Sequence, residues 1–321
     1  MAQEAQAEPR TMTCMEVWGG NQPADRGVVM PGLSAYVFAR PVGGEAGGDV
    51  HYVSSCATGR ITRMLVADVA GHGAHVAATA DRLRGLMRRY INYLDQASFV
   101  RALNEQFGRF EREGRFATAL CLTYWAPTRI ATFCNAGHPR PLLYHGRSGQ
   151  WQTLDATTVR ETPANLPLGI LAAIEYEQFH QRLEAHDLLL LYTDSALEAR
   201  SPDGRELGEG GLIEMISGLN SAHPEQLIAD LAARLVAYTG RDELEDDLTL
   251  MLVAHNDVQP RSGVSAWLEA SGRVAKEVVT SIGRKPVPWP DWRLETFGGI
   301  VSKRLNERWG GEPGADERVS E

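Results

Sequence analysis

The sequence has few cysteines and no long apolar run, and both absences exclude classes of protein. No stretch reaches the roughly 18 consecutive apolar residues that a membrane-spanning helix requires. The N-terminus MAQEAQAEPR lacks the apolar core of a secretory signal. The 4 cysteines show no CxxC spacing, so we do not expect a zinc ribbon or a dithiol redox motif. We therefore predict a cytoplasmic protein with no membrane-spanning segment.

Several well-defined catalytic motifs are also absent. The sequence contains no GxxxxGK[ST] phosphate loop, no HExxH zinc motif and no GxSxG nucleophile turn. Its nearest approach to GxGxxG begins at Gly71 and fails because Val76 occupies the last glycine position. These absences weaken the hypotheses of a nucleotide-binding protein, a zinc protease and a serine hydrolase.

The composition is that of an ordinary globular protein with an acidic balance. Of the 321 residues, 43% are hydrophobic and 23% are charged, which excludes a largely disordered or collagen-like chain. The 32 basic and 41 acidic residues give a net charge of −9. Because such a charge repels phosphate backbones and anionic lipids, we expect neither nucleic acid nor a membrane surface as the main partner.

The chain is longer than one typical domain of roughly 100–200 residues, and its composition changes near Asp257. All 3 lysines and 4 of the 7 tryptophans follow that position. We therefore predict a flexible lead-in at 1–32, a main domain at 33–257 and a Trp-rich helical extension at 258–321. Two amphipathic stripes in the extension indicate helices that either pack onto the domain or dock a partner, including a second subunit in a homodimer.

The main domain alternates between short strand-like runs and segments of helical periodicity. Strands arrive in consecutive hairpins and the helices gather between groups of strands, which favours an α+β fold in layers over a doubly wound sheet. The predicted strands are 33–39, 50–57, 60–67, 117–125, 129–135, 141–145, 188–192 and 248–254, and the predicted helices are 74–94, 97–111, 210–219 and 224–238.

Acidic residues stand at the ends of four of these apolar strands, each near glycine or threonine. Taken alone, an aspartate in such a place is more often a turn or cap residue than a functional one. If several converge, two carboxylates about 5 Å apart repel by roughly 3 kcal/mol at an effective dielectric of 20, so a cluster would need cations. An all-oxygen cluster suits Mg²⁺ or Mn²⁺ better than zinc. The residues in question are Asp49, Asp68, Asp194, Asp246 and Asp247.

The order of these motifs resembles a known family. Gly48-Asp49 is followed by DVAGHG from Asp68, NAGHP from Asn135, LYTD ending at Asp194 and DDLTL from Asp246. Together they are similar to the signatures of bacterial metal-dependent serine/threonine phosphatases of the PPM family, in particular the stage II sporulation protein E type. The resemblance covers about residues 33–254.

The resemblance implies a layered α-β-β-α sandwich with a pair of Mn²⁺ or Mg²⁺ ions in a cleft at one end. It also implies that the two cations activate a water for in-line attack on phosphorus. Asp68 would bridge both metals and the water, with the backbone carbonyl of Val69 beside it. Asp49 would bind the second metal, and Asp194 with Asp246 the first, with Asp247 as an alternative ligand.

Other residues of the same motifs would support these ligands. Gly48, Gly71 and Gly73 would allow close backbone approach. We expect His72 to orient the Asp68 loop and His138 to act at a strand end, with metal binding or general acid catalysis by His72 or His75 as the alternative. The sequence departs from the family pattern twice, because Tyr52 replaces a common acidic residue and Ser195 replaces a glycine.

The resemblance predicts an enzyme that hydrolyses phosphoserine or phosphothreonine on a regulatory protein, for example an anti-sigma-factor antagonist. Two alternatives stay open. The departures at Tyr52 and Ser195 are consistent with a pseudophosphatase that binds a phosphoprotein or signalling partner without turnover. A metal-dependent hydrolase of a small phosphorylated metabolite would need the same carboxylates.

Overall fold

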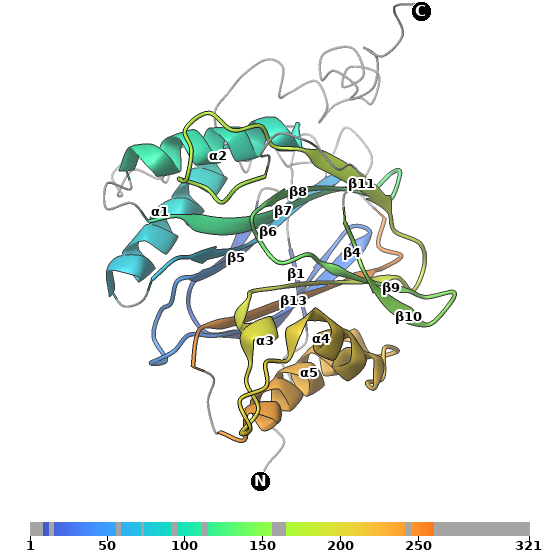
Figure 1. The fold of residues 1–321 in the computed structure, drawn as a ribbon. Helices are drawn as coiled ribbons and strands as arrows, with labels where there is room; N and C mark the ends of the chain where they lie inside the picture. Colours follow the sequence, from blue (N-terminus) through green and yellow to red (C-terminus); the bar gives the residue numbers. More distant parts are fainter. Residues whose placement is uncertain are drawn as a thin grey trace, which may run out of the picture.

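The computed structural model describes residues 9–12, 16–55, 59–71, 74–90, 95–110, 115–155, 165–241 and 245–259 (Figure 1). The predicted helices of the extension at 258–321 therefore lie outside the described residues, apart from its first two positions. Within the described parts of the chain, no helix is long and apolar enough to cross a membrane.

Two β-sheets form the centre of the molecule (Figure 1). One sheet has seven strands in the order β1-β3-β4-β13-β12-β9-β10, and the other has six in the order β11-β8-β7-β6-β5-β2. Neighbouring strands are antiparallel except β1 and β3. The strands of the first sheet are β1 (Arg10–Thr11), β3 (Ala24–Met30), β4 (Leu33–Arg40), β9 (Leu142–His145), β10 (Gln150–Thr153), β12 (Leu188–Tyr192) and β13 (Leu248–His255). Those of the second are β2 (Val17–Gly20), β5 (Asp49–Ser55), β6 (Ile61–Val69), β7 (Ala117–Trp125), β8 (Ile130–Ala136) and β11 (Gln178–Arg182).

Period-two alternation along the strands builds the core between the sheets. On β6, Met64 and Val66 face the other sheet, whereas Leu65 and Ala67 face the helices. On β12, Leu189 faces inward and its neighbours on either side face outward. Both faces of the central strands are apolar because both are covered, and each fully buried Val, Leu or Met side chain contributes roughly 1.5–3 kcal/mol.

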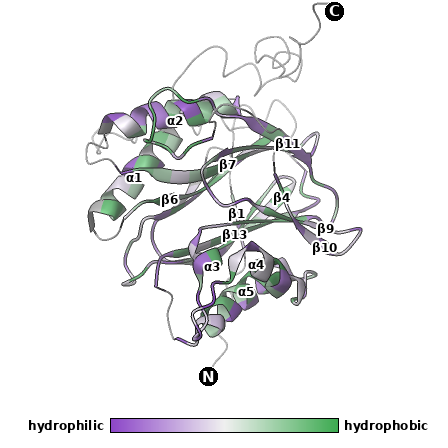
Figure 2. Cartoon of the chain, viewed as in Figure 1, coloured by the Kyte–Doolittle hydropathy of each residue, from purple (hydrophilic) through white to green (hydrophobic). Residues whose placement is uncertain are grey.

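Helices cover the outer face of each sheet, so the fold has four layers in the order α-β-β-α (Figure 1). Helices α1 (Ala74–Arg89) and α2 (Gln96–Phe110) pack on the six-stranded sheet, and α4 (Gly208–Ser217) and α5 (Pro224–Thr239) pack on the seven-stranded sheet. In Figure 2 the helices carry hydrophobic residues among hydrophilic ones, as expected for amphipathic cover. A short helix, α3 (Ser195–Glu198), directly follows β12.

The sequence predictions hold for most of the main domain and fail in part for the predicted lead-in. The eight predicted strands and four predicted helices correspond to elements of the structure, with bounds that differ by a few residues, while the predicted ends at 56–57, 91–94 and 111 lie outside the described residues. The lead-in at 1–32 is not a flexible segment throughout, since β2 and β3 lie within it and pair with β5 and β4. Glycines and charged residues, such as Asp25, Arg26 and Gly27 in β3, interrupt the alternation of apolar and polar residues by which a strand is predicted. The short elements β10, β11 and α3 were also not predicted.

Candidate functional site

Two of the candidate carboxylates are direct neighbours across adjacent strands. Asp49 begins β5 and Asp68 lies one residue before the end of β6, and the two residues are partners in the antiparallel register. Asp49 lies on the same face of β5 as Val53, and Asp68 lies on the same face of β6 as Val66. Both valines belong to the core between the sheets. The two carboxylates therefore lie side by side at one end of the sandwich, on the inner face of the six-stranded sheet.

Glycines bring the backbone of the segment before β5 close to these groups. A Cβ atom at Gly48 would lie 2.9 Å from the carbonyl oxygen of Val69 and 3.4 Å from Oδ1 of Asp68. At Gly47 it would lie 2.0 Å from Oδ2 of Asp247. A side chain at either position would collide with the site, which explains the two successive glycines before Asp49.

The seven-stranded sheet meets the same end of the sandwich through the residues that follow β12 and precede β13. Thr193 donates a hydrogen bond from Oγ1 to Oδ2 of Asp49 at 2.9 Å. Asp247 accepts two backbone hydrogen bonds, from Gly48 to Oδ2 at 2.6 Å and from Val42 to Oδ1 at 2.7 Å. Asp247 thus links the residues just before β13 to those just before β5. Both oxygens of its carboxylate already accept a hydrogen bond.

The carboxylates of this cluster interact electrostatically across the two sheets. Burial, followed by the charges of Asp194, Asp246 and Asp247, raises the pKa of Asp68 to about 7. Burial also raises the pKa of Asp49 well above its usual value, and the charge of Asp68 adds to this, while the neighbouring hydroxyls of Thr249 and Thr193 lower it. These five aspartates are therefore coupled electrostatically, and negative charge on the buried ones is disfavoured without a cation.

Asp194 and Asp246 lie at the loop side of this cluster. Asp194 directly precedes α3 and is half-buried, and burial followed by the charge of Asp246 raises its pKa, while the backbone of Ser195 lowers it. Asp246 is exposed just before β13. The structure thus brings the predicted ligands Asp49, Asp68, Asp194 and Asp246 to the same end of the sandwich.

The donor groups at this end of the sandwich suit hard divalent cations. They are all oxygens, comprising four carboxylates and the Val69 carbonyl beside Gly48, and Mg²⁺ and Mn²⁺ prefer such ligands. Burial, followed by the neighbouring carboxylates, raises the pKa of Asp68, and a bound cation would oppose both effects by stabilising the charged carboxylate. Among the described residues, no three His, Cys, Asp or Glu side chains are grouped so that they could hold one ion as they stand.

The histidine and glycine predictions of the DVAGHG motif are only partly described. Gly71 has a φ of 116°, a conformation that L side chains rarely adopt, which explains the glycine at this turn after β6. His72 and Gly73 fall outside the described residues, and so does the side chain of His75. Their predicted roles remain predictions.

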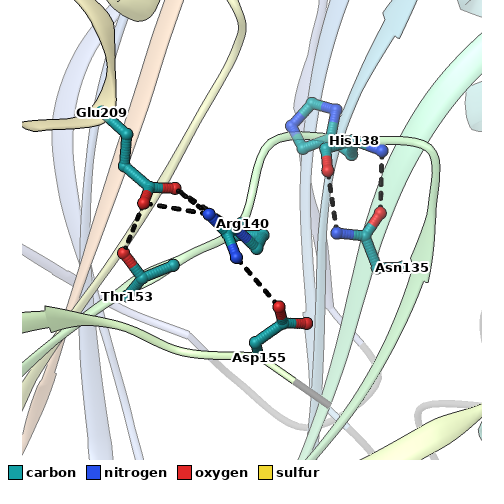
Figure 3. Close-up of polar contacts among 6 residues, drawn as sticks. All are labelled: Asn135, His138, Arg140, Thr153, Asp155 and Glu209. Carbon is teal, nitrogen blue, oxygen red and sulfur yellow. Dashed lines mark hydrogen bonds and ion pairs between the residues drawn. The ribbon is translucent and has the colours of Figure 1, made fainter. Parts of the chain in front are cut away.

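His138 is buried beside the cluster rather than within it. Its Nδ1 lies 2.8 Å from Oγ1 of Thr118, and Thr118 is the register partner of Asp68 on β7. The side chain of Asn135 brackets the His138 backbone, because it accepts from the amide at 2.7 Å and donates to the carbonyl at 2.8 Å (Figure 3). Burial lowers the pKa of His138 to about 3, so the ring is neutral at pH 7. This geometry is consistent with the predicted supporting role.

The loop that carries His138 from β8 to β9 crosses from one sheet to the other and is also held by Arg140. The guanidinium donates to Glu209 from Nε at 3.2 Å and from Nη2 at 3.0 Å, and to Asp155 at 2.9 Å (Figure 3). Thr153 donates to the same Glu209 at 2.8 Å. Sequence reasoning did not find this network, because its residues are far apart in the sequence, on β10, on α4 and in the segments that follow β8 and β10.

The two departures from the family pattern have different positions. Tyr52 is buried under α1 and α2 in the helix-facing layer, on the opposite strand face from Asp49. It therefore lies outside the carboxylate cluster. Ser195 is buried directly after Asp194, and its Oγ has no hydrogen-bond partner among the described residues.

Comparison with known proteins agrees with this geometry. A family model described as Stage II sporulation protein E (SpoIIE) matches residues 58–256. The chain belongs to this family. SpoIIE proteins are PPM-type serine phosphatases.

Two relatives from Bacillus subtilis (strain 168) show how far the similarity extends. Phosphoserine phosphatase RsbU is 23% identical over 191 residues, which cover 59% of this chain and 54% of RsbU. Stage II sporulation protein E is 31% identical over 98 residues, which cover 30% of this chain and 12% of that protein. The chain therefore spans little more than half the length of RsbU and a small part of the sporulation protein.

Solved structures of the SpoIIE type share the fold. The RsbU and RsbW domains of Rv1364c from Mycobacterium tuberculosis match with a TM-score of 0.61 at 22% identity, covering 78% of this chain and 70% of that one. The PP2C phosphatase domain of SpoIIE from Bacillus subtilis, with a fragment of its regulatory domain, matches with a TM-score of 0.59 at 20% identity, covering 69% and 63%. The predicted sandwich of two sheets between helices is thus confirmed as a PP2C-like fold.

Proposed function

We propose that the chain is a metal-dependent protein phosphatase that hydrolyses phosphoserine or phosphothreonine on a regulatory protein. The observation that supports this most is the meeting of Asp49, Asp68, Asp194 and Asp246, from two different sheets, at one end of the sandwich. RsbU, which is similar to this chain, is a phosphoserine phosphatase. RsbX matches the fold of this chain with a TM-score of 0.52, and its crystal structure is of a complex with magnesium.

The proposed ligand roles are those that the family resemblance implies, and the positions of the residues support them. Asp68 would contact both cations, because it stands between Asp49 on the neighbouring strand and the charges of Asp194 and Asp246. Asp49 would serve one cation, and Asp194 with Asp246 the other, while the Val69 carbonyl would add a ligand beside Gly48. When bound, two divalent cations would lower the pKa of a water molecule and stabilise charge on the transferring phosphoryl group.

The protein itself would position the carboxylate ligands and the backbone around them. The Gly47-Gly48 segment lets a backbone pass the carboxylates without side-chain collision. Asp247 would act on that backbone rather than as a ligand, because both its oxygens accept hydrogen bonds from Gly48 and Val42. Such an arrangement needs no phosphorylated enzyme intermediate, since no nucleophilic side chain is required when water attacks phosphorus.

An anti-sigma-factor antagonist is the specific substrate that we propose. The support is the similarity to RsbU, together with the fold shared with the RsbU and RsbW domains of Rv1364c. A net charge of −9 makes nucleic acid an unsuitable partner. The docking of a partner or second subunit through the extension stays a prediction.

Phosphate release from a phosphoserine peptide tests the proposed activity. We expect release that depends on Mn²⁺ and stops on addition of EDTA. Asp68→Asn and Asp194→Asn should each lower the rate about 100- to 1,000-fold, which is the usual cost of removing one group that stabilises transition-state charge. Asp25→Asn is the matched control, because Asp25 is an exposed aspartate on β3 and should leave the rate unchanged. Release that is unaffected by EDTA would overturn the proposal.

Ser195 supports one alternative, a pseudophosphatase that binds a phosphoprotein without turnover. Its hydroxyl is buried next to Asp194 and has no hydrogen-bond partner in the part of the chain that the structure describes. Tight binding of a phosphoserine peptide, with no metal-dependent release of phosphate, would favour this alternative. Faster turnover of sugar or nucleotide phosphates than of phosphopeptides would instead favour a metabolite hydrolase.

A further inference from the structure

The hydroxyl of Thr193 connects the two sheets at the carboxylate cluster. Thr193 directly follows β12 in the seven-stranded sheet, and Asp49 begins β5 in the six-stranded sheet. Oγ1 of Thr193 lies 2.9 Å from Oδ2 of Asp49. Thr193 is fully buried and Asp49 is only 6% exposed, so water does not compete freely for this contact. A buried hydrogen bond to a carboxylate is among the stronger polar contacts in a protein.

The surrounding backbone fixes the direction in which this hydroxyl donates. The amide of Thr249 donates to Oγ1 of Thr193 at 3.0 Å, and so it occupies one lone pair of the hydroxyl oxygen. The single hydroxyl proton is then available for an acceptor. Asp49 Oδ2 at 2.9 Å is nearer than the other acceptor in reach, the Thr249 carbonyl at 3.5 Å. The proton is therefore directed at the carboxylate.

The backbone around Thr193 is also held in place. The amide of Thr193 donates to the carbonyl of Thr249 at 3.0 Å, which continues the pairing of β12 and β13 beyond the last strand residue. The Thr193 hydroxyl consequently has little freedom to follow a moving carboxylate. It can hold one oxygen of Asp49 in a set position relative to the seven-stranded sheet.

We infer that Thr193 is a positioning residue for metal binding, which holds Oδ2 of Asp49 so that the other carboxylate oxygen is presented to a divalent cation. The inference rests on the proposed function, because it assigns a task to Thr193 only if Asp49 is a ligand. Partners that orient a ligand in this way typically contribute 10- to 100-fold to metal affinity or activity. Thr193 would thus fix the position of Asp49, on the six-stranded sheet, relative to the end of β12 in the seven-stranded sheet.

Direct Mn²⁺ binding, measured by calorimetric titration without substrate, tests this role. Thr193→Val removes the hydroxyl and keeps the branched shape, and it should weaken the Asp49-dependent cation about 10- to 100-fold. Thr193→Ser keeps the hydroxyl and should restore most of that affinity. Thr62→Val is the matched control, since Thr62 is a buried threonine on β6 whose Oγ1 has no partner among the described residues. Should Thr193→Val fail to fold, Thr193→Cys offers a side chain of similar size and a much weaker donor.

A double-mutant cycle separates an effect through Asp49 from a general disturbance of the neighbouring Asp194. In an Asp49→Asn background, Thr193→Val should cause no further loss of Mn²⁺ affinity, because the group on which it acts has gone. Equal losses in both backgrounds would overturn the inference, and so would a Thr193→Val protein that binds Mn²⁺ as tightly as the unchanged protein. Absence of Mn²⁺ binding by the unchanged protein would instead overturn the proposed function itself.

Discussion

The two sheets contribute to the carboxylate cluster in different ways. The six-stranded sheet supplies Asp49 and Asp68 from within paired strands, where their register fixes them opposite one another. The seven-stranded sheet supplies Asp194 and Asp246 from the residues just beyond β12 and just before β13. Asp49 is buried, whereas Asp246 is exposed. One half of the site is therefore built into strands, and the other half stands on loop positions.

This difference has a physical consequence for charge and movement. Asp68 is fixed in a strand ladder and cannot move away from its surroundings, so burial, followed by the charges of Asp194 and Asp246, raises its pKa to about 7. Carboxylates at loop positions can adjust their distance to a ligand at a lower cost, since fewer ladder hydrogen bonds restrain them. We therefore expect cation binding to move Asp194 and Asp246 more than Asp49 and Asp68.

Among substitutions that leave every carboxylate in place, the largest effect should come from disturbing the strand-built half. Gly48→Ala places a Cβ 2.9 Å from the backbone oxygen of Val69, and because backbone cannot swing aside, β5 must shift from β6. A displacement of about 1 Å at a reacting centre can cost 100-fold in rate, so we expect a loss of that order in metal-dependent phosphate release.

Gly108→Ala is the matched control for this substitution. Gly108 lies in α2 on the same side of the molecule, and a Cβ there would meet no atom within 4 Å. It should leave the rate unchanged and stabilise the helix by about 0.5–1 kcal/mol. A Gly48→Ala enzyme as active as the unchanged one would show that the strand-built half is not rigid.

A smaller effect is expected from His138, which supports the strand-built half through Thr118. Its pKa is about 3 in the folded chain and near 6.5 when unfolded, so between these values only the unfolded chain binds the proton. Stability from this residue is therefore complete above pH 6.5 and is lost as the pH falls. The loss should be about 2 kcal/mol between pH 6.5 and 5.

Urea unfolding in the presence of EDTA at several pH values measures this contribution. His138→Asn should be less stable at pH 7, because the contact with Thr118 changes, but its stability should fall less than that of the unchanged protein between pH 6.5 and 5. Parallel pH profiles for the two proteins would contradict the assignment of the acid sensitivity to His138. EDTA removes any contribution of metal loss at low pH.

Much of this arrangement could be predicted from the sequence. Period-two and helical patterns located the central strands and the four long helices, because both faces of each sheet are covered by apolar layers. The ordered motifs also located Asp49, Asp68, Asp194 and Asp246 at strand ends. Convergence of these ends followed only from the resemblance to phosphatases, since strand order is not visible in a single sequence.

Other features depended on contacts between distant positions. Thr193 and Asp49 are 144 positions apart, and Asp247 and Gly48 are 199 apart, so neither pair is marked by local spacing. The strands β2 and β3 were missed because Gly19, Gly20 and Gly27 interrupt their apolar alternation. The burial of Tyr52 under the helices also required the register of β5, which decides its face.

The most direct test of the two-sheet site is the number of Mn²⁺ ions that the protein binds, measured by calorimetric titration. We predict two ions for the unchanged protein, as expected for a paired-cation site. Asp49→Asn should remove one, and Asp68→Asn should remove both, because Asp68 stands between the two halves. No bound ion, or a number unchanged by Asp68→Asn, would contradict the account.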